Sequence, residues 1–220
     1  MNEHTDPPHG HSPDTGNPEH TDAHGAAAWD ERYADADQLW SGHVNGSLEI
    51  EAGDLPAGRA LDVGCGEGAD AIWLAERGWT VTAVDISSVA VDRARAEAER
   101  RGVVVDWLAG DLLDRSIEPR AFDLVSLQYP AFDIARLDEV VETLERAVGA
   151  GGVLLVVGHA IPDDAEDLHF DPADYVQPAD IAPRLGDGWT VEVHEERPRP
   201  GDHHHGGHFV DDVILRASRA

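Results

Sequence analysis

Hydrophobic residues in the middle of the chain form short runs that are separated by helical patterns. In residues 137–148, for example, apolar side chains recur every three or four positions, as on the buried face of a helix. Short apolar strands that alternate with helices are typical of an α/β fold, because each helix returns the chain for another parallel strand. The strands predicted in this way cover residues 60–63, 79–84, 103–108, 124–128 and 153–157, and the fifth is apolar throughout, as expected for a fully buried strand.

The two ends of the chain depart from this pattern. Residues 1–28 are rich in His, Asp and Pro and show no apolar periodicity, which predicts a disordered tail ahead of a domain that covers residues 29–220. Near the other end, residues 172–185 favour a helix. Trp189, Val191 and Val193 alternate with polar residues as in a half-buried strand, and residues 210–217 predict the last strand.

Three glycines at alternate positions, Gly64, Gly66 and Gly68, lie between the first predicted strand and a helix. Glycine allows a sharp turn through positive φ, and it lets the backbone approach a ligand with no Cβ in the way. The free N–H groups at the start of the helix would face that ligand. The stretch ALDVGCGEG at residues 60–68 therefore predicts a ligand site at the carboxyl ends of the strands.

Two acidic residues add to this prediction. Asp85 ends the second strand, where a carboxylate can accept hydrogen bonds from both hydroxyls of a ribose. Asp62 stands two residues before the first glycine, a position that the dinucleotide-binding fingerprint does not require. The glycine spacing, G-x-G-x-G, also differs from the G-x-G-x-x-G of nicotinamide enzymes. It disfavours the alternative of an NAD(P)-dependent oxidoreductase, which stays open at this point.

The pattern D-x-G-x-G-x-G, followed by an acidic residue at the end of the next strand, resembles the class I S-adenosylmethionine-dependent methyltransferases. Gly110-Asp111-Leu112 and Phe122-Asp123-Leu124-Val125 match further parts of that family. The resemblance implies a Rossmann-like α/β fold with helices on both faces of a seven-stranded, mostly parallel sheet. It also implies an antiparallel last strand, the strand order 3-2-1-4-5-7-6, and S-adenosylmethionine as the cofactor.

The resemblance places the cofactor along the tips of the first four strands. Asp111 would lie near the adenine amine, and Gln128, at the tip of the fourth strand, would border the transferred methyl group. Cys65 is more simply explained as a small residue in a tight turn than as a reactive thiol. The residues expected to contact the cofactor are Trp40, Asp62, Gly64, Cys65, Gly66, Asp85, Ile86, Asp111, Leu112 and Gln128.

Residues 29–50 resemble the N-terminal segment of small-molecule methyltransferases, including the tellurite-resistance and thiopurine-type relatives, where this segment folds over the cofactor. We therefore expect a lid that includes Trp40. The alternative is a helix packed against the edge of the sheet, with Trp29 and Tyr33 in the packing.

Methyl transfer from a sulfonium is an in-line displacement, so the protein mainly supplies orientation and desolvation. A base is needed only if the small-molecule acceptor must lose a proton. The candidates for such a catalytic group are His159, Tyr129, His208 and Asp211, with His43 in the lid as another. Whether the acceptor atom is oxygen, nitrogen, sulfur or a metalloid is not determined by the sequence.

The formal charge of −28, from 44 acidic and 16 basic residues, would repel nucleic-acid phosphates and argues against DNA or RNA as a partner. No stretch of about 20 apolar residues could span a membrane. A polar N-terminus and a single cysteine favour a cytoplasmic protein.

Histidines gather in two polar segments, one before residue 25 and one at residues 203–208, the latter followed by Asp211 and Asp212. Such segments could bind divalent metals loosely. Their spacing fits no fixed zinc motif, so no metal site is predicted. They nevertheless raise a third hypothesis, a non-enzymatic metal-binding protein on a methyltransferase-like scaffold.

Overall fold

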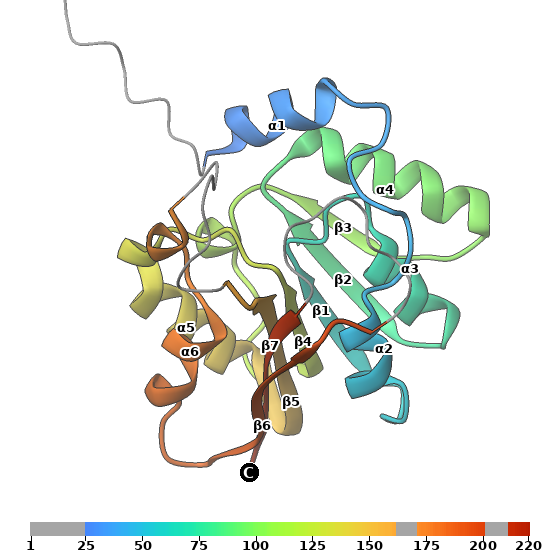
Figure 1. Ribbon diagram of the computed structural model, residues 1–220. Helices are drawn as coiled ribbons and strands as arrows, with labels where there is room; N and C mark the ends of the chain where they lie inside the picture. Colours follow the sequence, from blue (N-terminus) through green and yellow to red (C-terminus); the bar gives the residue numbers. More distant parts are fainter. Residues whose placement is uncertain (1–24, 162–170, 201–210) are drawn as a thin grey trace, which may run out of the picture.

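The computed structural model describes residues 25–161, 171–200 and 211–220, which form an α/β fold around one seven-stranded sheet in the order β3-β2-β1-β4-β5-β7-β6 (Figure 1). The strands are β1 (Arg59–Val63), β2 (Thr80–Asp85), β3 (Asp106–Ala109), β4 (Phe122–Gln128), β5 (Val148–His159), β6 (Trp189–Pro198) and β7 (Asp211–Arg219). The first five are parallel, and β7 is antiparallel to both β5 and β6. The predicted fold class and strand order are confirmed.

The helices connect the strands and precede the sheet. They are α1 (Ala26–Ala34), α2 (Gly46–Ala52), α3 (Ala69–Glu76), α4 (Ser88–Arg101), α5 (Leu137–Ala147) and α6 (Pro178–Ile181). Short 3₁₀ turns occur at η1 (Leu112–Asp114), η2 (Ile134–Arg136), η3 (Pro172–Asp174) and η4 (Ala182–Arg184). Within the described part of the chain, no helix has both the length and the apolar character needed to cross a membrane.

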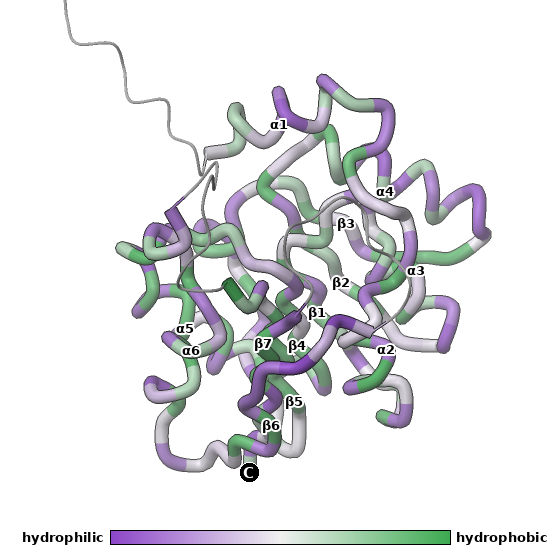
Figure 2. Tube along the Cα trace, in the orientation of Figure 1, coloured by the Kyte–Doolittle hydropathy of each residue, from purple (hydrophilic) through white to green (hydrophobic). Residues whose placement is uncertain are grey.

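The sheet separates two hydrophobic cores, and β5 contributes to both. Leu154 and Val156 pack into the core under α5 and α6, which we call the α5-side core. Val153, Leu155 and Val157 pack into the opposite core under α2 and α3, the α3-side core. Because both faces are covered, β5 is apolar at almost every position, as the sequence predicted. Figure 2 shows hydrophobic residues concentrated along the central strands.

The third predicted strand and the predicted helix over residues 172–185 differ from the structure. The third strand begins at Asp106, not at 103, because α4 ends in a left-handed Gly102 and the Val103 N–H still bonds to Ala98 O. Val104 is 90% exposed in the connection. Residues 172–185 form η3, α6 and η4 in place of one helix, since prolines, which lack the N–H for an intrahelical bond, stand at the first turn of each.

The alternation in β6 is interrupted. Trp189 packs against the α5-side core and Val193 against the α3-side core, while Val191 is 44% exposed. A register shift between Val191 and Val193 explains this, because a bulge moves the following side chains to the other face. The prediction that these three residues share one buried face was therefore wrong.

The N-terminal segment, residues 29–50, covers the carboxyl-end side of the first strands. Its helix α1 begins at Ala26 and lies alongside α4 (Figure 1). Asp30 of α1 accepts hydrogen bonds from Ser87 Oγ at 2.6 Å and from the backbone N–H of Val89 at 3.2 Å, so it binds the first turn of α4. These bonds lower the pKa of Asp30, with Ser87 as the main cause.

Candidate cofactor and acceptor site

The glycine turn between β1 and α3 is held against the end of β2. Gly64, Gly66 and Gly68 have φ of +71°, +51° and +84°, in the left-handed region that glycine tolerates. The N–H groups of Gly64 and Cys65 donate to Val84 O at 2.8 and 3.1 Å. A Cβ on Gly68 would lie 2.6 Å from the Trp107 ring, whereas a Cβ on Gly64 would meet no atom within 4 Å. Gly68 therefore serves packing, and Gly64 borders open space.

Asp85 lies at the tip of β2, where the sequence placed it. Its two carboxylate oxygens accept the backbone N–H groups of Gly66 at 2.7 Å and of Ser87 at 2.9 Å. The residue is 8% exposed, and burial raises the pKa of Asp85 despite these two bonds. The carboxylate is thus fixed beside the glycine turn.

Two more buried carboxylates adjoin the turn. Asp70 accepts the backbone N–H of Asn45 at 2.8 Å and its side-chain amide at 2.7 Å. Asp62 Oδ2 is buried and has no hydrogen-bond partner. Burial, and then the charges of Asp70 and Asp85, raise the pKa of Asp62 well above its usual range, and burial raises that of Asp70. Among the described residues, none of these three carboxylates forms an ion pair with a basic residue.

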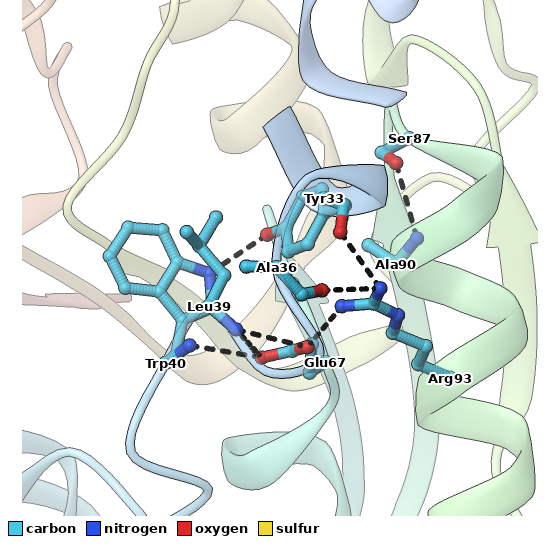
Figure 3. A network of polar contacts seen from close by, with 8 residues as sticks. All are labelled: Tyr33, Ala36, Leu39, Trp40, Glu67, Ser87, Ala90 and Arg93. Atoms are coloured by element: carbon cyan, nitrogen blue, oxygen red, sulfur yellow. Dashed lines mark hydrogen bonds and ion pairs between the residues drawn. The ribbon is translucent and has the colours of Figure 1, made fainter. Parts of the chain in front are cut away.

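The N-terminal segment brings two aromatic residues onto the turn. Trp40 Nε1 donates to the Tyr33 hydroxyl at 2.8 Å. A Cβ on Gly66 would lie 3.0 Å from that hydroxyl and 3.3 Å from the Trp40 ring. Tyr33 is almost completely buried, whereas Trp40 is 52% exposed. Figure 3 shows both side chains together with the polar contacts that hold their backbone.

The remaining residues expected at the cofactor lie along neighbouring strand tips, with different surroundings. Ile86 is half-buried directly after β2, and Leu112 is buried in the α5-side core. Asp111 accepts the N–H of Leu113 and forms a 2.5 Å ion pair with Arg136, so its carboxylate already has a cationic partner. Arg136 therefore already binds the Asp111 carboxylate, which was expected to lie near the adenine amine.

Cys65 and Gln128 are both buried close to the turn. Burial, followed by the charges of Asp62 and Asp85, raises the pKa of the Cys65 thiol well above its usual range, which fits a packing role. The Gln128 side chain donates to Ser126 Oγ at 3.0 Å, and its Oε1 is buried without a hydrogen-bond partner.

Two of the predicted catalytic candidates meet where β4 and β5 end. Tyr129 follows β4 with a left-handed φ of +53°, and its ring stacks on His159 with 4.3 Å between ring centroids. The Tyr129 hydroxyl donates to Asp212 at 3.0 Å. Burial, and then the Asp212 charge, raise the pKa of Tyr129, so it stays a phenol at neutral pH.

Arg199 completes this group, which we call the tyrosine cluster: Ser47, Tyr129, His159, Arg199 and Asp212. Arg199 Nη2 lies 2.7 Å from His159 Nδ1, and because a guanidinium can only donate, Nδ1 is the acceptor. Arg199 Nε also donates to Asp212 at 3.0 Å. Burial and the Arg199 charge lower the pKa of His159 to about 4.

The carboxylate at this end of the sheet is Asp212 and not the predicted Asp211. Asp212 is fully buried, and it also accepts a hydrogen bond from Ser47 Oγ at 3.1 Å. Asp211 contributes its backbone carbonyl, which accepts the N–H of Ala160. His43, the further candidate, is exposed in the N-terminal segment.

His208 and the other histidines of both histidine-rich segments lie outside the described residues. In the part of the chain that the structure does describe, no group of three or more His, Cys, Asp or Glu side chains could hold a metal ion.

The site also contains polar residues that were not predicted from the sequence, among them Glu67, Arg93 and Arg199. Glu67 stands inside the glycine motif, so an acidic residue at that place was a visible signal. Arg93 and Arg199 gave none, because Tyr33 and His159, which they contact, lie 60 and 40 residues away along the chain.

The glycine turn, the carboxylate at the end of β2 and the strand order together define the fold of the class I S-adenosylmethionine-dependent methyltransferases, whose cofactor is S-adenosylmethionine. This chain has that fold, and its residues 60–152 match the family described as "Methyltransferase domain". The family resemblance drawn from the sequence is thereby confirmed, while the narrower likeness to tellurite-resistance and thiopurine-type relatives stays a prediction.

Solved structures extend the similarity beyond the matched domain. One, solved for the conversion of a disulfide bond into a thioacetal group during echinomycin biosynthesis, is 26% identical. It has a TM-score of 0.72 and covers 88% of this chain and 92% of the other. A SAM-dependent methyltransferase from Methanosarcina mazei shares the fold, with 18% identity, a TM-score of 0.60 and coverage of 83% and 98%.

The similarity to curated proteins is more partial. A ribosomal RNA small subunit methyltransferase C from Alcanivorax borkumensis is 32% identical over 109 residues, which cover 46% of this chain and 32% of that protein. The chain spans between a third and two thirds of the length of the first curated relatives that it matches.

Proposed function

We propose that this protein transfers a methyl group from S-adenosylmethionine to a small-molecule acceptor. The observation that carries the proposal is the set of buried carboxylates at the glycine turn, Asp62, Asp70 and Asp85, which have no basic partner among the described residues. Burial raises the pKa of these three carboxyl groups, and a cationic ligand beside them would favour their charged form. S-adenosylmethionine fits, because it supplies an activated methyl group on a sulfonium and also carries an ammonium group.

The same carboxylates disfavour the nicotinamide alternative. A dinucleotide would bring two pyrophosphate charges to the glycine turn, and like charges at short range in a poorly solvated site repel strongly. The proposed roles follow the local geometry. Asp85 would bind the ribose hydroxyls, Gly64 would allow close approach of the ligand, and Trp40 would shield it from water.

The tyrosine cluster would border the acceptor. Tyr129 is a phenol that already donates to Asp212, and His159 is neutral with its Nδ1 occupied by Arg199. Neither side chain is therefore placed to accept a proton from the acceptor at neutral pH. We therefore favour an acceptor atom that is nucleophilic without losing a proton, with the cluster orienting it.

The proposal of a small molecule over a nucleic acid rests on charge. One relative is named as a ribosomal RNA methyltransferase, yet the formal charge of −28 on this chain opposes RNA binding. The similarity to the structure solved for the conversion of a disulfide bond into a thioacetal group during echinomycin biosynthesis supports the proposal of a small-molecule acceptor.

Isothermal titration with S-adenosylmethionine and with NADH tests the cofactor directly. We expect the former to bind and the latter not to bind, and the reverse result would favour an oxidoreductase. A screen of metabolite and metalloid acceptors that measures release of S-adenosylhomocysteine would then identify the acceptor. Tight binding of divalent metal, with no turnover of cofactor for any acceptor, would support the metal-binding hypothesis.

A further inference from the structure

Glu67 stands between Gly66 and Gly68, yet its side chain reaches away from the turn to the N-terminal segment. Its carboxylate accepts the backbone N–H groups of Leu39 at 3.1 Å and Trp40 at 3.0 Å. The side chain is only 12% exposed. Hydrogen bonds to a carboxylate are stronger than those between neutral groups, so this residue holds two consecutive peptides of the segment directly.

Arg93 of α4 holds the preceding part of the same segment. Its Nη1 pairs with Glu67 at 3.0 Å, and its Nη2 donates to the carbonyls of Tyr33 at 2.8 Å and Ala36 at 2.7 Å. Figure 3 shows Glu67 between the Leu39–Trp40 backbone and the Arg93 guanidinium. One ion pair therefore fixes the backbone at four positions between residues 33 and 40.

Packing contributes less to this segment than polar contacts do. Tyr33 is the only residue of α1 that is buried, and Trp40 remains 52% exposed. Segments with few buried apolar contacts open at low free energy unless something else holds them. Glu67 and Arg93 supply that hold, and they do so from the glycine motif and from the helix after Asp85.

We propose that Glu67 and Arg93 are positioning residues of the cofactor site: they hold residues 33–40, and with them the Trp40 indole, against Gly66. The inference rests on the proposed function, in which the glycine turn binds S-adenosylmethionine. Loss of the ion pair frees the segment, weakens retention of the cofactor and leaves the two hydrophobic cores intact.

The test compares Glu67→Gln with the matched variant Glu97→Gln, which disrupts an exposed ion pair with Arg100 on α4. Two quantities are measured on the full chain: amide hydrogen exchange without ligand, and the dissociation constant for S-adenosylmethionine. We expect Glu67→Gln to speed exchange in residues 33–45 but not in β1. We expect it to raise the dissociation constant about tenfold, as for a weakened charge-assisted bond. Glu97→Gln should change neither quantity.

A double variant, Glu67→Gln with Arg93→Met, strengthens the test. The effects of substitutions at residues that act through one network are not additive. The double variant should therefore raise the dissociation constant for S-adenosylmethionine by measurably less than the product of the two single-variant effects. Suppose that the wild-type protein binds S-adenosylmethionine. If Glu67→Gln then leaves either the exchange in residues 33–45 or the affinity unchanged, the positioning role alone is overturned. A wild-type protein that does not bind S-adenosylmethionine would overturn the proposed function and this role with it.

Discussion

The backbone N–H of Gly66 donates to Asp85 Oδ2 over 2.7 Å, so the glycine turn after β1 is tied to the tip of β2. Asp85 therefore shapes the turn as well as offering a carboxylate to a ribose. Asp85→Ala should weaken S-adenosylmethionine binding by about 1–3 kcal/mol, through loss of charge-assisted hydrogen bonds. Calorimetry measures the change in affinity. The affinity of Asp85→Asn, which keeps the size of the side chain, should lie between those of the wild type and the alanine variant. Unchanged affinity in the alanine variant would remove Asp85 from the site.

Gly64 and Gly78 form a matched pair of glycines. Both have positive φ, +71° and +87°, and at neither would a Cβ meet an atom within 4 Å. An alanine at either position should thus cost a similar backbone strain, about 1–2 kcal/mol. Only Gly64 lies in the glycine turn, so Gly64→Ala should lower cofactor affinity while Gly78→Ala does not. Thermal denaturation measures the strain in both variants, and titration with S-adenosylmethionine measures their affinity. Equal affinities of the two variants would show that the cofactor does not occupy the space beside Gly64.

Asp62 is buried with one unpartnered oxygen, and burial and neighbouring carboxylates raise its pKa. A carboxyl group whose pKa is raised on folding stabilises the protein below its unfolded pKa, and that stability is lost as the pH rises through the folded pKa. Asp62→Asn should therefore raise the melting temperature more at pH 8 than at pH 5, while weakening cofactor binding. Equal melting temperatures for the variant and the wild type at pH 8 would contradict this account.

Trp40 is half exposed although it lies on the glycine turn. Trp40→Ala should reduce turnover more than stability, and cofactor binding should change the fluorescence of the wild-type indole. Trp73, which is 7% exposed in the α3-side core, is the matched control. Trp73→Ala should cost about 3–5 kcal/mol of stability with normal activity per folded molecule. If Trp40→Ala behaves like that control, Trp40 is a packing residue and not part of the lid.

His159 gives a pH prediction of its own. Its pKa of about 4 in the folded protein lies below the value of about 6.5 for an unfolded histidine. Between these two pH values the unfolded chain binds more protons, so this contribution to stability is complete above the unfolded pKa and is lost as the pH falls through the folded pKa. Melting temperatures measured from pH 7.5 to 4.5 should drop less steeply in His159→Gln than in the wild type. Parallel curves would show that His159 is not held neutral by its surroundings.

The general architecture could be predicted from local signals. Apolar runs gave the strand positions, because buried parallel strands are apolar on both faces. The errors arose where one or two residues decide the outcome. Gly102 ends α4 in a left-handed conformation and delays β3, and a bulge between Val191 and Val193 reverses the faces of β6.

The cofactor side of the site was more predictable than the acceptor side. Asp62, the glycines and Asp85 lie close together in sequence, and their spacing alone indicates a turn and two strand tips. Tyr129 donates to Asp212, which lies 83 residues away, and Arg199 reaches His159 across 40 residues, so only the folded sheet brings them together. The choice of Asp212 over Asp211 depends on strand register, because a shift of one residue exchanges the two faces of β7.

The position of β7 between β5 and β6 has a consequence for the order of folding during synthesis. The cofactor half, β1 to β3, consists of neighbouring segments that can pair as soon as they emerge. The acceptor half cannot, because β5 and β6 expose unpaired edges until residues 211–219 insert between them and bring Asp212 to Tyr129. A nascent chain could thus acquire its cofactor-binding half well before it has a place for the acceptor.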